Sequence, residues 1–258
     1  MDMMIQIKNL QLESGEVAIW WLGQNFFIIK TSTGKRLAVD PYLSRQAKYV
    51  YVHPKAPMEP EELEVDYILC THDHLDHTDP ITLPIVSKNF PHTVFAGPPE
   101  SCRHLQSLGI EKRRLIQFKI GGSYSLGEYG VRVYSSATPE EANTSHYGYI
   151  IECEDTKIYV MGDSFKTAVT SPETILNPVR KAAPDIAVVP IVGDIPDRKP
   201  GDALKWCMYI KPKVVIPSHY GCFADRTIDP EEFVKLFKNI TDVKPVVIPY
   251  MGCFIYRL

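Results

Sequence analysis

Three histidines and two aspartates fall within six residues in the segment Thr71-His72-Asp73-His74-Leu75-Asp76-His77. Imidazole and carboxylate together are the usual ligands of zinc and related divalent cations. His72 and His74 are two residues apart, so both side chains can point the same way from an extended loop. Asp76 and His77 follow at an expected helix entrance, where they can face a second ion about 3.5–4 Å from the first. The spacing therefore predicts a centre for two divalent metal ions.

Two more apolar runs end in residues that suit such a centre. Asp163 follows Gly162 after residues 157–161, and we expect its two oxygens to bridge the ions. His219 follows residues 214–217 and is expected to close the second site. Asp40 ends another apolar run, and we expect it to orient a histidine ligand through the ring nitrogen that does not bind metal.

The elements that must position these residues alternate between strands and helices. Residues 17–30 read as two strands joined by a turn at Gly23, and residues 41–60 as an irregular loop. Further strands are expected at 36–40, 65–70, 93–96, 115–118, 131–135, 147–152, 157–161, 186–190, 214–217, 246–249 and 252–257. Helices are expected at 80–88, 99–108, 172–182, 200–210 and 230–239. The pattern predicts an α/β (α+β) domain over residues 1–258, with mixed sheets faced by helices.

Composition narrows the classes of function. The net charge of −3 over 258 residues gives no reason to expect nucleic acid as a partner. We expect no signal peptide and no membrane span, since no basic region precedes an apolar core and no apolar run nears twenty residues. The six cysteines show no CxxC spacing, which favours buried thiols in the reducing cytoplasm.

The ordered motifs resemble those of the metallo-β-lactamase-fold hydrolases. They are His72-x-His74-x-Asp76-His77, then Gly162-Asp163-Ser164, then Pro217-Ser218-His219. Within that family, the stretches at 18–23, 71–74, 162–164 and 214–231 are most similar to the L-ascorbate-6-phosphate lactonase group. The resemblance implies a four-layer αββα sandwich, a binuclear metal centre and a homo-oligomer.

One position departs from the wider family. Most of its members carry another metal-binding histidine after the run at 131–137, where this chain has Thr138. The lactonase group is similar in lacking that histidine. His146 lies a few residues later and is the candidate replacement, although an exposed loop histidine explains it equally well. A site without it would be more open, so zinc and manganese are both candidate metals.

We therefore predict a metal-dependent hydrolase, a lactonase acting on a small sugar-derived lactone, with or without a phosphate. A metal-bound hydroxide would attack the carbonyl, with Asp76 and Asp163 as the catalytic candidates. Four loop cations are candidate contacts for an anionic part of the substrate: Lys166, Arg198, Lys199 and Arg226.

Two other functions are consistent with the motifs. A phosphodiesterase or nuclease would use the same two ions, but the chain is not basic and shows no aromatic and basic stripe. The other is a non-catalytic metal-binding protein, to which Thr138 in the place of a ligand gives some weight.

Overall fold

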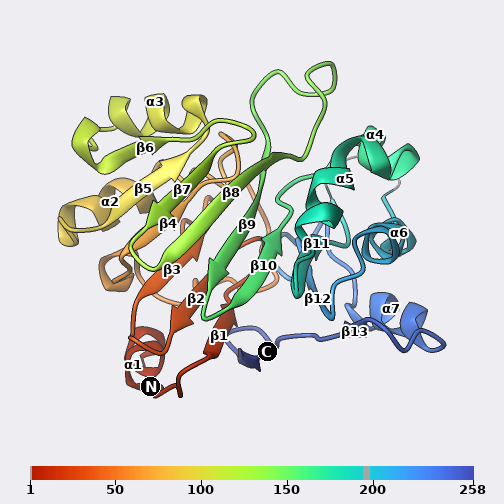
Figure 1. The fold of residues 1–258 in the computed structure, drawn as a ribbon. Coiled ribbons are helices and arrows are strands. Elements are labelled where there is room, and N and C mark those ends of the chain that lie inside the picture. The colour runs from red at the N-terminus through yellow and green to blue at the C-terminus, as the bar shows by residue number, and fades with distance from the viewer. Residues whose placement is uncertain (1, 194–197) are drawn as a thin grey trace.

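The computed structural model describes residues 2–193 and 198–258, and the strands of this part form two seven-stranded sheets. The strand order is β14-β1-β2-β3-β4-β5-β6 in the first sheet and β13-β12-β11-β10-β9-β8-β7 in the second. Figure 1 shows the two sheets between two groups of helices, with α2 and α3 outside the first and α4 to α7 beside the second. The expected arrangement of mixed sheets faced by helices is confirmed.

The bounds of the elements are as follows. The strands of the first sheet are β1 Glu16–Trp21, β2 Phe27–Thr31, β3 Arg36–Val39, β4 Tyr67–Leu69, β5 Val94–Gly97, β6 Leu115–Gln117 and β14 Cys253–Arg257. Those of the second are β7 Ser123–Leu126, β8 Tyr129–Ser135, β9 Tyr147–Cys153, β10 Thr156–Val160, β11 Ile186–Pro190, β12 Val214–Ser218 and β13 Lys244–Pro245. The α-helices are α1 Met3–Asn9, α2 Thr82–Asn89, α3 Pro99–Ser107, α4 Lys166–Thr170, α5 Pro172–Ala182, α6 Pro200–Ile210 and α7 Glu231–Val234.

Each sheet changes from antiparallel to parallel pairing part-way across. In the first sheet, β14, β1, β2 and β3 pair antiparallel, and β3 to β6 pair parallel. In the second, β7 to β10 pair antiparallel, and β10 to β13 pair parallel. Because parallel strands end at the same edge, the loops after β3 and β4, and those after β10 and β12, gather at common edges.

Alternate residues of β1 face two different cores, as the two-residue repeat of a strand requires. Val17, Ile19 and Trp21 belong to the core between the two sheets. Ala18 and Trp20 belong to a second core, between the first sheet and the helices α1, α2 and α3. Both faces of this strand are thus buried, which explains its nearly continuous apolar sequence.

One expected strand is wrong. Residues 246–249 form no strand, and β13 ends at Pro245. The N–H of Val246 still donates to the carbonyl of Val215 at 2.8 Å, but the next donor of β12 in this parallel ladder would be residue 217, a proline without an N–H. The helix expected at 230–239 is also shorter, because α7 covers Glu231–Val234 and a 3₁₀ turn follows at Lys235–Phe237.

The expectations missed α1, β7 and α4. The helix α1 is short, and the Asp2 side chain caps it by accepting from the N–H of Met4 at 2.9 Å. The buried Lys30 ammonium holds its other end by donating to the carbonyls of Ile7, Lys8 and Leu10 at 2.7–2.8 Å. Such long-range contacts leave no local signal in the sequence. Among the described residues, no helix has the length and apolar character that a membrane crossing requires.

Candidate metal centre

The predicted ligands come together at one end of the two sheets. His72, His74, Asp76 and His77 lie in the loop after β4, and Asp163 and His219 follow β10 and β12. Gly162 allows the close approach of this second loop to the first, since its φ is +67° and a Cβ there would lie 3.0 Å from Thr71 Cβ. The fold therefore joins motifs that are far apart in the sequence.

The first group of candidate ligands consists of His72, His74 and His146, whose ligand atoms all lie within 4.8 Å of one another. His72 Nε2 and His74 Nδ1 are 2.8 Å apart. The ring of His146 stacks on that of His72, with 4.0 Å between the centroids. Three imidazoles converging in this way form a nitrogen set that suits zinc and similar ions.

The second group consists of His72, His77 and Asp163, again with ligand atoms within 4.8 Å. Asp163 Oδ1 lies 3.1 Å from His77 Nε2 and 2.6 Å from His219 Nε2, whereas Oδ2 lies 3.4 Å from His72 Nε2. Asp76 Oδ2 is 3.5 Å from His77 Nε2. The two oxygens of Asp163 thus face histidines of both groups, which is the arrangement that a bridging carboxylate needs.

His146 lies where the third histidine is needed, and Thr138 does not. Thr138 lies in the wall of a cavity of about 240 Å³, which His146 also lines, and contacts Glu141, with 3.4 Å between Oγ1 and Oε2. His146 is 3% exposed and immediately precedes β9, which carries its ring to His72 and His74. The exposed-loop alternative for His146 is therefore wrong, while its role as a ligand stays a prediction.

The donors present fit divalent ions. His77 Nε2 and His146 Nδ1 are both buried and make no hydrogen bond. His77 Nε2 has the carboxylate of Asp163 3.1 Å away, whereas His146 Nδ1 has no partner among the described residues. A buried polar atom without a partner costs about 1–3 kcal/mol, so such atoms usually have a use. One of the two nitrogens belongs to each group, as expected if each group holds one ion.

Burial and neighbouring charges set the protonation of these residues. Burial, with the positive charge of His77, holds the pKa of His72 well below its usual range, and burial lowers the pKa of His146 to about 4. Both rings are therefore neutral at pH 7, with a lone pair for a metal. Burial alone would lower the pKa of His77, but the carboxylates of Asp163, Asp76 and Asp40 outweigh it and raise that pKa.

The pKa of Asp163 moves the opposite way from the effect of its burial. Burial would raise it, but the positive charge of His77, the nearby His72 ring and the hydrogen bond with His219 hold it well below its usual range. In the metal-free protein the proton thus resides on His77, and Asp163 is a carboxylate. A cation near His77 Nε2 would replace that proton.

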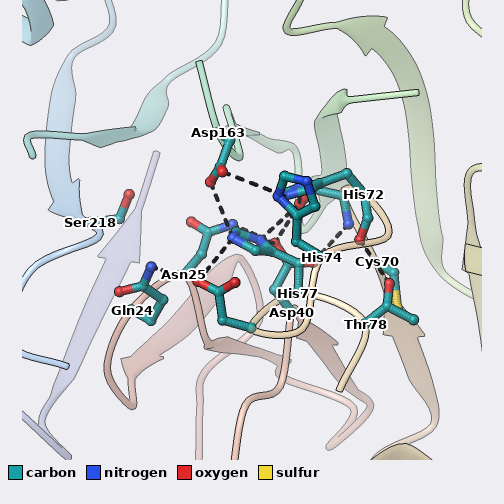
Figure 2. A network of polar contacts seen from close by, with 12 residues as sticks. Gln24, Asn25, Asp40, Cys70, His72, His74, His77, Thr78, Asp163 and Ser218 are labelled. Carbon is teal, nitrogen blue, oxygen red and sulfur yellow. Dashed lines mark hydrogen bonds and ion pairs between the residues drawn. The ribbon is translucent and has the colours of Figure 1, made fainter. Parts of the chain in front are cut away.

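Asp40 makes the contact that was expected of it. It is fully buried, and its Oδ2 accepts from His77 Nδ1 at 2.7 Å, Thr71 Oγ1 at 2.6 Å and Asn25 Nδ2 at 2.7 Å. Its Oδ1 accepts from the N–H of Thr71 at 2.7 Å. Figure 2 shows Asp40 and Asp163 on opposite sides of His77. Because Nδ1 donates to Asp40, Nε2 is left facing Asp163.

Sequence reasoning missed the residues that hold the motif loop in place. Thr78 Oγ1 donates to the carbonyl of His72 at 2.7 Å and contacts Ser101 Oγ at 2.9 Å. His104 Nδ1 pairs with Asp73 Oδ1 at 2.8 Å. Ser101 and His104 belong to α3, which is separated from the loop in the chain, so nothing in the local pattern marks them.

A cavity of about 210 Å³ opens onto the centre. It is lined by Gln24, His74, Asp76, Asp163, Gly193, His219 and Arg226. The guanidinium of Arg226 lies 4.9 Å from the ring centroid of Phe223. Among the described residues that line this cavity, Arg226 is one of the four candidate substrate contacts, and the other three, Lys166, Arg198 and Lys199, are not in its lining.

The other cations lie elsewhere. Arg198 is 8% exposed, stacks on the Trp206 ring at 4.2 Å, and donates to Ser164 Oγ at 2.7 Å and to the carbonyl of Pro190. It therefore supports the turn next to Asp163 from within the protein. Lys166 is exposed at the start of α4. Their substrate contacts stay predictions without support from this geometry.

Comparison with known proteins agrees with this centre. A family model described as a beta-lactamase superfamily domain matches residues 18–219. A UPF0173 metal-dependent hydrolase from Aeropyrum pernix is 32% identical over 227 residues, which cover 83% of this chain and 87% of the relative. Another from Bacillus cereus is 30% identical over 220 residues, with coverages of 81% and 88%.

Solved structures share the fold. A metallo hydrolase from the archaeon Ignicoccus hospitalis matches 94% of this chain and 99% of its own, with a TM-score of 0.72 and 21% identity. An isothiocyanate hydrolase from Delia radicum gut bacteria matches 93% of this chain and 100% of its own, with a TM-score of 0.71 and 16% identity. At these identities the likeness shows the fold alone, and it confirms the expected αββα architecture.

Proposed function

The chain belongs to the beta-lactamase superfamily and, within it, to the UPF0173 metal-dependent hydrolases. From this premise we propose that the protein binds two divalent ions and uses them to hydrolyse a small molecule. One observation carries the proposal. Each group of candidate ligands has one buried nitrogen that makes no hydrogen bond, His146 Nδ1 in one and His77 Nε2 in the other. Zinc and manganese are both candidates for the ions.

The ligand roles follow from the distances. We assign His72, His74 and His146 to the first ion, and Asp76, His77 and His219 to the second. Asp163 would contribute to both, because its oxygens face His72 on one side and His77 and His219 on the other. When bound, such ions lower the pKa of water and polarise the bond to be cleaved.

The chain's own residues orient the reactants and move the proton. Asp40 fixes the His77 ring through Nδ1, so that Nε2 stays turned to the centre. A carboxylate oxygen of Asp163 is placed to accept the proton that water loses as it attacks. Asp76 lines the same cavity and is the other catalytic candidate. The buried sheets behind the centre exclude bulk water from the far side of these histidines.

For the substrate we propose a sugar-derived lactone, with or without a phosphate. The support is the resemblance of the motifs to the L-ascorbate-6-phosphate lactonase group, together with a cavity of about 210 Å³ that opens onto the centre. Arg226 in the cavity wall is the candidate contact for an anionic group on that substrate.

We also propose a cytoplasmic homo-oligomer without a nucleic-acid or membrane partner. The support for the cytoplasm is the state of the six cysteines, which are all free, five of them buried. The net charge of −3 argues against nucleic acid. Homo-oligomerisation rests on the resemblance to the lactonase group.

Elemental analysis of the purified protein, followed by a panel of lactones and phosphodiesters, tests the proposed activity. We expect two divalent ions per chain and turnover of at least one lactone. Turnover of phosphodiesters alone would replace the lactonase with a phosphodiesterase. Bound metal with no turnover of either class would favour the non-catalytic metal-binding protein.

A further inference from the structure

Gln24 lies at the junction of three segments that carry the candidate ligands. It belongs to the turn between β1 and β2 and is 5% exposed. The structure places it in the wall of the cavity over the centre, beside His74, Asp76 and His219. Figure 2 shows Gln24 and its neighbour Asn25 at the edge of the same polar network.

The backbone of Gln24 is fixed by two hydrogen bonds. Its carbonyl accepts from the indole N–H of Trp21 at 3.1 Å and from the backbone N–H of His219 at 3.1 Å. The Trp21 ring in turn stacks on Tyr220, with 4.4 Å between centroids. Gln24 has a φ of +51°, a left-handed conformation that an L side chain rarely adopts, and these bonds hold it there.

The side chain of Gln24 acts on Asp76. Its Nε2 donates to Asp76 Oδ2 at 2.9 Å, and the same oxygen lies 3.5 Å from His77 Nε2. A neutral amide donor fixes the direction of a carboxylate without neutralising it, so the carboxylate keeps its charge for a cation. The Asp76 side chain is 21% exposed and lines the cavity, so this hydrogen bond restricts its rotation there.

A purely structural role does not account for this side chain. Gln24 Oε1 is buried and makes no hydrogen bond, which is unfavourable and would be avoided by an apolar residue of the same length. The contacts that hold the turn use the backbone carbonyl and not the carboxamide. The carboxamide is therefore explained by its contact with Asp76.

We propose that Gln24 is a positioning residue for the second metal ion: it holds Asp76 toward His77 and His219 before the ion arrives. The inference rests on the two-ion centre proposed above. Groups that orient metal ligands typically change metal affinity by about 10–100-fold when they are removed. We expect an effect of that size on the second ion and little effect on the first.

Gln24→Met tests this inference, because methionine keeps the length of the side chain and the backbone carbonyl while removing the amide donor. Gln106→Met, at an exposed position on α3, is the matched control. Metal-free wild type and both variants would be titrated with Zn²⁺ and with Mn²⁺ by calorimetry, and their unfolding temperatures compared. We expect Gln24→Met to bind the second ion about 10–100-fold more weakly, with the first ion and the metal-free unfolding temperature unchanged.

The outcomes separate this inference from the proposed function. Wild-type protein that binds fewer than two ions would contradict the two-ion centre itself. Wild-type protein that binds two ions, with Gln24→Met binding both equally well, would overturn the role of Gln24 alone. The role of Gln24 would also be overturned if Gln24→Met bound both ions more weakly and unfolded at a lower temperature, because the carboxamide would then support the fold.

Discussion

Asp40→Asn should weaken both the fold and the second metal site, because Asp40 accepts four hydrogen bonds while fully buried. The asparagine oxygen would take the place of Oδ2, where three donors meet: Asn25, Thr71 Oγ1 and His77 Nδ1. The amide NH₂ would then face the backbone N–H of Thr71, which loses its acceptor.

The magnitude follows from these contacts. Three hydrogen bonds to a charged acceptor become bonds to a neutral one, at a loss of about 1 kcal/mol each, and the unpaired N–H adds about 1–3 kcal/mol. Relief of the desolvation of the carboxylate offsets part of this. We therefore expect the metal-free protein to lose about 3–5 kcal/mol of unfolding free energy, the range found when a buried pair is broken. The affinity for the second ion should fall about 10–100-fold, since the His77 ring loses its orientation.

Urea unfolding of the metal-free protein and calorimetric metal titration measure the two effects. Asp242→Asn is the matched control, because Asp242 is exposed and bonds to its neighbour Thr241. If Asp40→Asn unfolds within about 1 kcal/mol of the control and binds both ions normally, the reasoning about Asp40 is refuted.

Three further predictions concern His146, the pH dependence and Lys30. In a metal titration, His146→Gln should lower the affinity for the first ion at least about 100-fold, whereas Thr138→Ala should leave that affinity unchanged. Equal affinities in the two variants would show that His146 is not a ligand of the centre. Because burial lowers the pKa of His146 to about 4, the unfolded chain binds a proton between about pH 6.5 and 4 that the folded metal-free chain does not. This residue should therefore make the metal-free protein less stable as the pH falls through that window, and urea unfolding should show a flatter pH dependence in His146→Gln. Lys30→Met should leave three carbonyls at the end of α1 without their buried donor and destabilise the fold by about 2–4 kcal/mol, with metal binding unchanged; a normal unfolding curve would show that water replaces the ammonium.

The candidate ligands at strand ends were predictable, because polar residues after apolar runs show in the sequence. The motif at 72–77, Asp163 and His219 all follow such runs, and the structure brings them together. The sequence did not decide whether His146 lies at the centre or in an exposed loop, since its place depends on where the preceding loop ends and β9 begins. Gln24 and Asn25 carry no pattern of their own, and their contacts join residues distant in the chain.

Packing explains the remaining differences. Arg198 was a candidate substrate contact from its place in a loop, but the Trp206 ring and Ser164 hold it inside the protein. The apolar residues at 246–249 resembled a strand, yet Pro217 of the neighbouring β12 has no N–H to donate to Val246, and the pairing ends with β13. In each case the deciding contact comes from another part of the fold.

The central claim is that Asp163 joins two metal ions held by the two groups of histidines. The most direct test is the metal content per chain of wild type and Asp163→Ala, measured by elemental analysis after equilibration with Zn²⁺ or Mn²⁺. We predict two ions per wild-type chain, and loss of most bound metal together with hydrolytic activity in the variant. One ion or none in the wild type, or two ions retained by Asp163→Ala, would contradict the claim.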